Sequence, residues 1–181
     1  MNTLLALLIL EFGNELERIT ADYKEGNTDK AEWRAKFLAL LTRYLLLAYM
    51  LGLDTTTLTA EQEQAVSDAV ANQALYLDGF KDDIGNLTLE EATTRARLYA
   101  SSATAVYWDA ATGELKLPAY PGDGSTQCLQ FCKCAWHIVW LNRAKGHANA
   151  YWTLGEAEHC PDCEERTRVW NPLKIRNWQY Q

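Results

Sequence analysis

All five cysteines of the 181-residue chain lie within one stretch of 36 residues. Three of them, Cys128, Cys132 and Cys134, come before two alternating apolar runs. The other two, Cys160 and Cys163, form a Cys-Pro-Asp-Cys sequence at the start of a helical pattern. Thiolates are soft metal ligands, and structural zinc sites draw four ligands from two turns far apart in sequence. The clustering therefore predicts a metal site.

The two groups of cysteines differ in spacing. The two-residue spacer between Cys160 and Cys163 lets both sulfurs face one point, and the start of the helix that follows offers backbone N–H groups and a positive dipole end. Cys128 and Cys132 have a three-residue spacer, whereas Cys132 and Cys134 share one face of an extended segment. We expect one structural Zn²⁺ per chain, held by four of the five: Cys160, Cys163 and two of the others.

Two other roles stay open for these cysteines: disulfide bonds and metal-free burial. Disulfides leave one thiol over because the count is odd. A secretion signal is not expected, because the apolar run Leu4–Leu10 has no basic residue before it and no small-residue cleavage site after it. The same run is too short to span a bilayer, which takes about 20 residues. Close, paired spacing outside an oxidising compartment is more typical of metal binding.

The histidines do not complete a known catalytic pattern. A His-metal nuclease needs a histidine on the hairpin and a metal ligand on the next helix. His137 and His147 suit the first position. The second position is not filled, because no histidine or asparagine follows Cys163 before Asn171. The His-x-Glu and Pro-Cys-x-x-Cys pattern of zinc deaminases is missing. A protease pair such as Cys134 with His147 has no orienting neighbour. We expect no enzymatic activity; a treble-clef nuclease is the weaker alternative.

Net charge is −7 and the isoelectric point about 5.0, whereas a generic nucleic-acid binder carries a basic field. The charge is uneven, because the chain from Lys133 onward is mildly basic and the chain before it is acidic. Six cations of the basic part could contact phosphate: Arg143, Lys145, Arg166, Arg168, Lys174 and Arg176. A zinc-finger nucleic-acid binder is therefore an alternative, although a solvated surface of mixed charge is favoured.

Hydrophobic periodicity predicts about four helices in a helical region of residues 1–116. The first covers roughly residues 2–25 and ends at Gly26. Its start is apolar on all sides, so it should pack against more than one partner, and another subunit is one such partner. The interface candidates are Leu4, Leu5, Leu8 and Phe12.

Capping boxes mark the starts of the remaining helices: Asp29 with Glu32, Thr59 with Gln62, and Thr88 with Glu91. We expect these helices to end near Gly52, by Gly85 and at Gly113. The stretch before Gly113 fits either a helix tail or a hairpin that turns there, and the helix tail is favoured.

Residues 117–181 are expected to form a Cys-rich module. Prolines and glycines in residues 117–125 mark its boundary. A strand from Ala135, a turn over 142–149 and a second strand predict a β-hairpin, and a short helix follows Cys160. The order of cysteines, hairpin, cysteines and helix matches treble-clef zinc folds, so the expected class is α+β. Metal binding suits a small hairpin that lacks a core of its own.

With both regions in view, the sequence resembles the head morphogenesis proteins of tailed phages, of the Mu F-like minor head family. The resemblance covers most of the chain. The segments that carry it are Gly26–Trp33, Tyr76–Phe80 and Arg95–Ala100 in the helical region, and Leu117–Cys128 and Cys132–Trp136 in the module.

This resemblance implies a virion structural or assembly protein, either a minor head protein or one associated with the portal. Such proteins accompany the portal and the capsid interior during head assembly, and some copies are packaged. The implied partners are portal and capsid proteins, with further copies of the chain as another. The implied location is the virion, and the host cytoplasm during assembly. Nucleic acid is not a favoured partner, and a membrane is not expected to be one.

Overall fold

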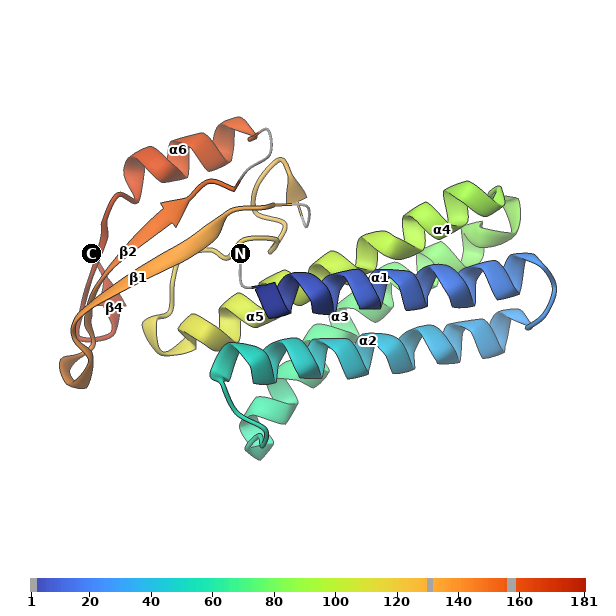
Figure 1. Cartoon of the computed structure of the whole chain (residues 1–181), viewed down its shortest axis with the longest axis horizontal. Coiled ribbons are helices and arrows are strands. Elements are labelled where there is room, and N and C mark those ends of the chain that lie inside the picture. Colours follow the sequence, from blue (N-terminus) through green and yellow to red (C-terminus); the bar gives the residue numbers. More distant parts are fainter. Residues whose placement is uncertain (1–2, 130–131, 156–158) are drawn as a thin grey trace.

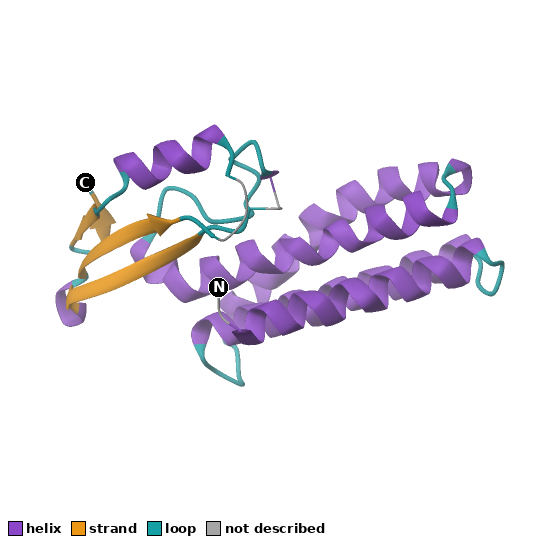
Figure 2. Ribbon diagram, turned by 45° about the horizontal axis from the view of Figure 1, so that its top comes forward, coloured by secondary structure: helices purple, strands orange, loops and turns teal. Residues whose placement is uncertain are grey.

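The computed structural model describes residues 3–129, 132–155 and 159–181. The fold is α+β: long helices lie along one another, and an antiparallel sheet with a short helix lies beside one end of them (Figure 1). Figure 2 shows the same division between helices and strands from a second direction. The class expected from the sequence is therefore confirmed at this level.

The helical region contains five helices in the described residues: α1 Thr3–Lys24, α2 Lys30–Leu53, α3 Ala60–Asp83, α4 Leu89–Leu98 and α5 Ser102–Thr112. The fourth predicted helix is thus divided by a 3₁₀ turn at Tyr99–Ser101. The hydroxyls of Ser101 and Ser102 donate to the backbone carbonyls of Leu98 and Tyr99, which competes with regular helix bonding. On either side of the turn the packing partner changes, because α4 packs on α1 and α5 packs on α2.

Helix boundaries largely follow the predicted signals. The capping boxes at Thr59 and Thr88 are both present. Asp29 caps α2 by accepting from the Glu32 N–H at 2.8 Å, but the Glu32 carboxylate pairs with Lys36 at 2.8 Å and the described residues show no return bond. Helix α5 ends at Thr112, so the helix-tail interpretation is confirmed.

An aromatic cluster holds the helices together. The rings of Trp33, Phe37, Phe80 and Tyr99 meet edge to face, with centroids 5.0–6.2 Å apart in four such pairs. The Trp33 indole donates to the buried Thr20 hydroxyl at 3.2 Å, which satisfies both groups in the core. Helices α1 to α4 share this cluster, whereas α5 packs in a second buried cluster with α2 and α3.

The interface prediction for the first helix needs correction. Leu5 and Phe12 are fully buried, and Leu8 is partly buried against the core. Their apolar character serves contacts within the chain, because α1 packs against both α2 and α4. Of the four candidates, Leu4 alone is largely exposed, at 60%. Two exposed neighbours that the sequence reading did not select are Leu7 at 57% and Leu10 at 50%.

Helix α2 passes a test of length and apolar composition for crossing a membrane. In this fold it packs against α1, α3 and α5, and its buried residues are Trp33, Phe37, Leu41, Tyr44, Leu45 and Ala48. Core helices of soluble proteins pass the same test, so the finding is weak evidence for a membrane span.

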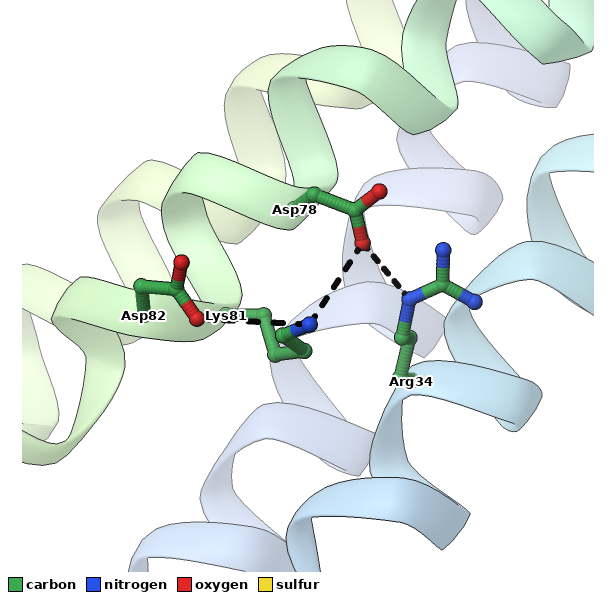
Figure 3. Close-up of polar contacts among 4 residues, drawn as sticks. All are labelled: Arg34, Asp78, Lys81 and Asp82. Carbon is green, nitrogen blue, oxygen red and sulfur yellow. Dashed lines mark hydrogen bonds and ion pairs between the residues drawn. The ribbon is translucent and has the colours of Figure 1, made fainter.

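Ion pairs join α2 to α3 on the surface. The Arg34 Nε lies 2.8 Å from Asp78 Oδ1, and Lys81 Nζ lies 3.8 Å from the same oxygen (Figure 3). Lys81 also lies 3.9 Å from Asp82. The hydrogen bond from Arg34 is the largest factor that lowers the pKa of Asp78. Exposed pairs of this kind contribute little to stability.

Lys24 caps the far end of α3. Its ammonium group donates to the backbone carbonyls of Ile84 at 3.1 Å, Gly85 at 3.4 Å and Leu87 at 2.5 Å. Because these bonds involve a charged donor, Lys24→Met should lower the free energy of unfolding by about 1–2 kcal/mol in urea titrations. The matched control is Lys36→Met, which loses one exposed pair and should cost less than about 0.5 kcal/mol. Equal losses in both variants would contradict the capping role.

Because two tyrosines are buried, we expect the fold to lose stability at alkaline pH. Burial is the largest factor that raises the pKa of both Tyr44 and Tyr99 to about 12, and the Tyr44 hydroxyl also donates to Glu15 at 2.7 Å. A tyrosine in the unfolded chain ionises near pH 10. The contribution of Tyr44 and Tyr99 to the free energy of unfolding is therefore complete below about pH 10, and it is lost as the pH rises towards 12. The loss should reach about 2–3 kcal/mol for each residue.

Denaturant midpoints measured between pH 9 and pH 12 test this loss. Tyr44→Phe and Tyr99→Phe should flatten the pH dependence, whereas Tyr76→Phe, which changes a side chain on a 70% exposed residue, should leave it unchanged. A wild-type midpoint that stays constant over this range would refute the prediction.

The C-terminal sheet has four antiparallel strands in the order β1-β2-β3-β4: Ala135–Asn142, His147–Thr153, Leu173–Arg176 and Gln179–Tyr180. The predicted hairpin is confirmed, with Trp136 opposite Trp152. Helix α6 Pro161–Val169 follows Cys160 as expected. Strands β3 and β4 were not predicted, because they are short and gain their order from a non-local pairing of β3 with β2.

The module has a hydrophobic core of its own, which corrects the expectation that it lacks one. Trp136, Trp152 and Trp170 lie with ring centroids 5.2–5.7 Å apart. The Arg166 guanidinium lies over two of these rings, at 5.0 Å and 5.1 Å. Other buried members of this core are Leu115, Leu117, Ala148, Ala150, Leu173 and Ile175.

Candidate metal centre

The second pair of cysteines is positioned by the start of α6. Cys160 is the extended residue that precedes the helix, and Pro161 occupies its first turn, where its missing N–H and fixed φ are favourable. The N–H groups of Cys163 and Glu164 donate to the Cys160 carbonyl at 3.0 Å and 3.2 Å. This tight turn places both cysteines at the positive end of the helix dipole.

The loop that carries the first cysteines is fixed on α6 by polar contacts. The Gln127 N–H donates to the Asp162 carboxylate at 2.8 Å. Arg166 donates to the carbonyl of Ser125 at 2.9 Å and to its hydroxyl at 3.0 Å. These bonds bring the first cysteine of the loop against the start of the helix. Sequence reading did not find them, because each partner lies more than 30 residues from the other.

Three short contacts join four sulfurs. The Sγ atoms of Cys128 and Cys163 are 3.6 Å apart, those of Cys132 and Cys163 are 3.5 Å apart, and those of Cys160 and Cys128 are 3.4 Å apart. None of the five cysteines forms a disulfide. With zinc–sulfur bonds of about 2.3 Å, a tetrahedron of thiolates has edges of about 3.8 Å. The three observed spacings are close to that value, and the only one of them that includes Cys160 is its contact with Cys128.

Cys128, Cys132 and Cys163 have all their sulfurs within 4.8 Å of one another and could hold a metal ion. Cys132 and Cys163 are buried, whereas Cys128 and Cys160 are half-buried. The cluster therefore lies between the core of the module and its surface. A structural metal ion in such a place is shielded from solvent and is within reach of a soft donor set.

Cys134 has a different place in the cluster. It is buried, but it takes part in none of the three short contacts. A hydrogen bond from its thiol is the largest factor that lowers the pKa of Cys132, to about 5, and the same bond raises the pKa of Cys134. Cys134 therefore lies beside the cluster and interacts with Cys132.

The other thiols divide into two kinds. Burial raises the pKa of Cys128 and of Cys163. Burial also raises the pKa of Cys160, but hydrogen bonds from the Cys163 backbone and from Cys128 outweigh it, so the net pKa is lowered. A cation bound to these sulfurs would favour the deprotonated form of each thiol.

The histidines considered as catalytic candidates lie away from this cluster. His147 is at the opposite end of the hairpin, where its Nε2 is 3.3 Å from Asn177 Oδ1. His137 is exposed on the outer face of β1, with its ring 6.1 Å from that of Tyr151. Neither takes part in the sulfur contacts of the described residues.

No family model matches the sequence, and neither a curated protein nor a solved structure matches it.

Proposed function

We propose that the chain is a non-catalytic protein with one structural Zn²⁺, bound by Cys128, Cys132, Cys160 and Cys163 in a treble-clef-like module. The observation that carries this proposal is the chain of three sulfur contacts at 3.4–3.6 Å. Four thiolates fill a tetrahedral zinc ion, so no position is left open for water or substrate. The role of the ion is then to fix the loop, the hairpin and α6 together.

The biological role that we propose is assembly of a tailed-phage virion, as a minor head protein or one associated with the portal. The sequence resemblance described above supports this role. The two buried clusters that join the helices support it too, because such a bundle can present a rigid surface to portal or capsid subunits. Leu4, Leu7 and Leu10 are exposed on the first turns of α1 and form the contact surface in this proposal. The protein would then be found in the virion, and in the host cytoplasm during assembly.

Nucleic-acid binding is disfavoured because several basic side chains already contact other groups of the same chain. Arg166 is held between aromatic rings and the Ser125 backbone. Arg168 pairs with Glu165, and Arg176 donates to backbone carbonyls. Arg143 lies over the Trp140 ring at 5.2 Å, so four of the six cations that could contact phosphate have partners within the chain.

Sedimentation with assembly intermediates tests the virion role. The tagged chain should co-sediment with capsids or portal rings produced by the same phage. Replacing Leu4, Leu7 and Leu10 together by glutamate should remove it from those fractions. Leu75→Glu, at a 73% exposed position on α3, is the matched control and should leave it in place. A chain that stays a free monomer at every stage of assembly would overturn the proposal.

A further inference from the structure

Strand β1 is an open edge of the sheet. It pairs with β2 on one side, and β2 is the described element on which it chiefly packs. Apart from the Thr153 hydroxyl on the Ala135 carbonyl, the described residues give the β1 backbone no hydrogen bond beyond its pairing with β2. Backbone groups on the outer side of an edge strand can pair with another extended chain.

This edge lacks the features that usually protect edge strands. Its eight residues contain no proline, lysine or carboxylate, and the register irregularity lies at the far end, between Trp140 and Asn142. The other edge, β4, is two residues long and offers little backbone. Val139 is 38% exposed and Leu141 is 55% exposed on the outer face of β1, so apolar side chains of an added strand would find contacts there.

The charged residues that flank β1 in the sequence are of one sign. Between Ser125 and Gly155 the chain has three charged residues: Lys133 before β1, and Arg143 and Lys145 after it. All three residues are exposed. The hairpin is thus basic at both ends, although the whole chain has a net charge of −7.

We propose that β1 binds an extended segment of another protein as a fifth strand. That segment has alternating apolar residues at its centre and carboxylates near both ends. Its backbone would supply the hydrogen bonds, its apolar side chains would pack on Val139 and Leu141, and its carboxylates would lie near Lys133 and Lys145. The proposal rests on the sheet alone and does not depend on the virion role.

A second copy of the chain fits this edge poorly. Antiparallel pairing of two β1 strands would bring Lys133 of each copy towards Arg143 and Lys145 of the other. Parallel pairing would bring the two copies of Lys133 together. Like charges in cross-strand positions are destabilising, so charge complementarity favours an acidic segment over self-association.

A peptide array provides the test. The array holds nine-residue peptides with valine and threonine alternating at the centre and either glutamate or lysine at both ends, and each has a variant with a central proline. The zinc-loaded chain should bind the glutamate peptides at least tenfold more tightly than the lysine peptides. The proline variants should not bind, because proline cannot donate a backbone hydrogen bond. Amide exchange at β1 should slow when the bound peptide is present.

Charge-reversal variants test whether the peptides bind at the β1 edge. Lys133→Glu with Lys145→Glu should weaken binding of the glutamate peptides about tenfold, whereas Lys174→Glu with Lys116→Glu, the matched double reversal away from β1, should change it less than twofold. Zinc content and circular dichroism must be the same in both variants. Absence of any binding, unchanged exchange at β1, equal effects of the two double variants, or concentration-dependent dimers that protect β1 would each overturn the proposal.

Discussion

Cys163→Ser is expected to abolish stoichiometric zinc binding and to loosen the C-terminal module more than any other single substitution. Cys163 is 1% exposed and takes part in two of the three sulfur contacts. Structural zinc contributes about 10–16 kcal/mol of apparent binding free energy in small zinc modules, so loss of a central ligand should cost several kcal/mol. Because the module has a tryptophan core, we expect it to keep its hairpin and to lose order around the cysteines.

Metal analysis and amide exchange measure these effects. Protein purified without chelator should contain one zinc ion per chain, and chelator treatment should reproduce the exchange pattern of Cys163→Ser. The matched control is Cys134→Ser, which removes a buried thiol outside the three contacts and should retain one zinc ion. Wild-type protein without zinc would refute the metal centre. Loss of zinc from Cys134→Ser alone would refute the assignment of ligands.

Gly52→Ala is the second substitution for which we expect a large effect. A Cβ atom at Gly52 would lie 2.4 Å from the Tyr107 carbonyl oxygen and 2.8 Å from the Ala110 Cβ. These contacts belong to the packing of α2 on α5, where backbone atoms cannot move aside as a flexible side chain can. We expect a loss of about 2–4 kcal/mol, typical of overpacking that displaces a helix.

Gly79→Ala provides the opposite expectation. Gly79 lies inside α3, and a Cβ atom there would meet nothing within 4 Å. Alanine should therefore stabilise the chain by about 0.5–1 kcal/mol, because it has the higher helix propensity. Chemical denaturation of both variants checks the pair. A Gly52→Ala variant as stable as the wild type would show that the close approach of α2 to α5 does not limit stability, and a destabilised Gly79→Ala variant would contradict the second expectation.

The sequence predicted local features well, because their causes are local. The capping threonines, Thr59 and Thr88, fix where helices begin, and the alternation from Ala135 fixes the hairpin. The division at Tyr99–Ser101 was missed, because the helical spacing of Ala96, Tyr99 and Ala103 continues through it and the change of packing partner is a tertiary effect. The burial of Leu5 was missed for a similar reason: an all-round apolar helix start is equally compatible with an outside partner and with two neighbours inside the chain.

For the candidate metal centre, clustering in the sequence identified the cysteines but not their arrangement. Spacing left the choice among Cys128, Cys132 and Cys134 open. The short sulfur contacts involve the first two and do not involve Cys134. This distinction depends on the path of the loop, which is set by contacts of Asp162 and Arg166 with residues 125–127. Such long-range contacts leave no periodic signal in the chain.

The close spacing of the sulfurs also has a consequence for handling the protein in air. A disulfide bond is about 2 Å long, so thiols that already lie 3.4–3.6 Å apart need little movement to form one. Two such thiols give up two protons and two electrons to dissolved oxygen, and the resulting disulfide can no longer bind zinc. Metal loading and oxidation therefore compete for the same atoms, and protein that was stripped of metal before exposure to air should reload incompletely until a reductant is added.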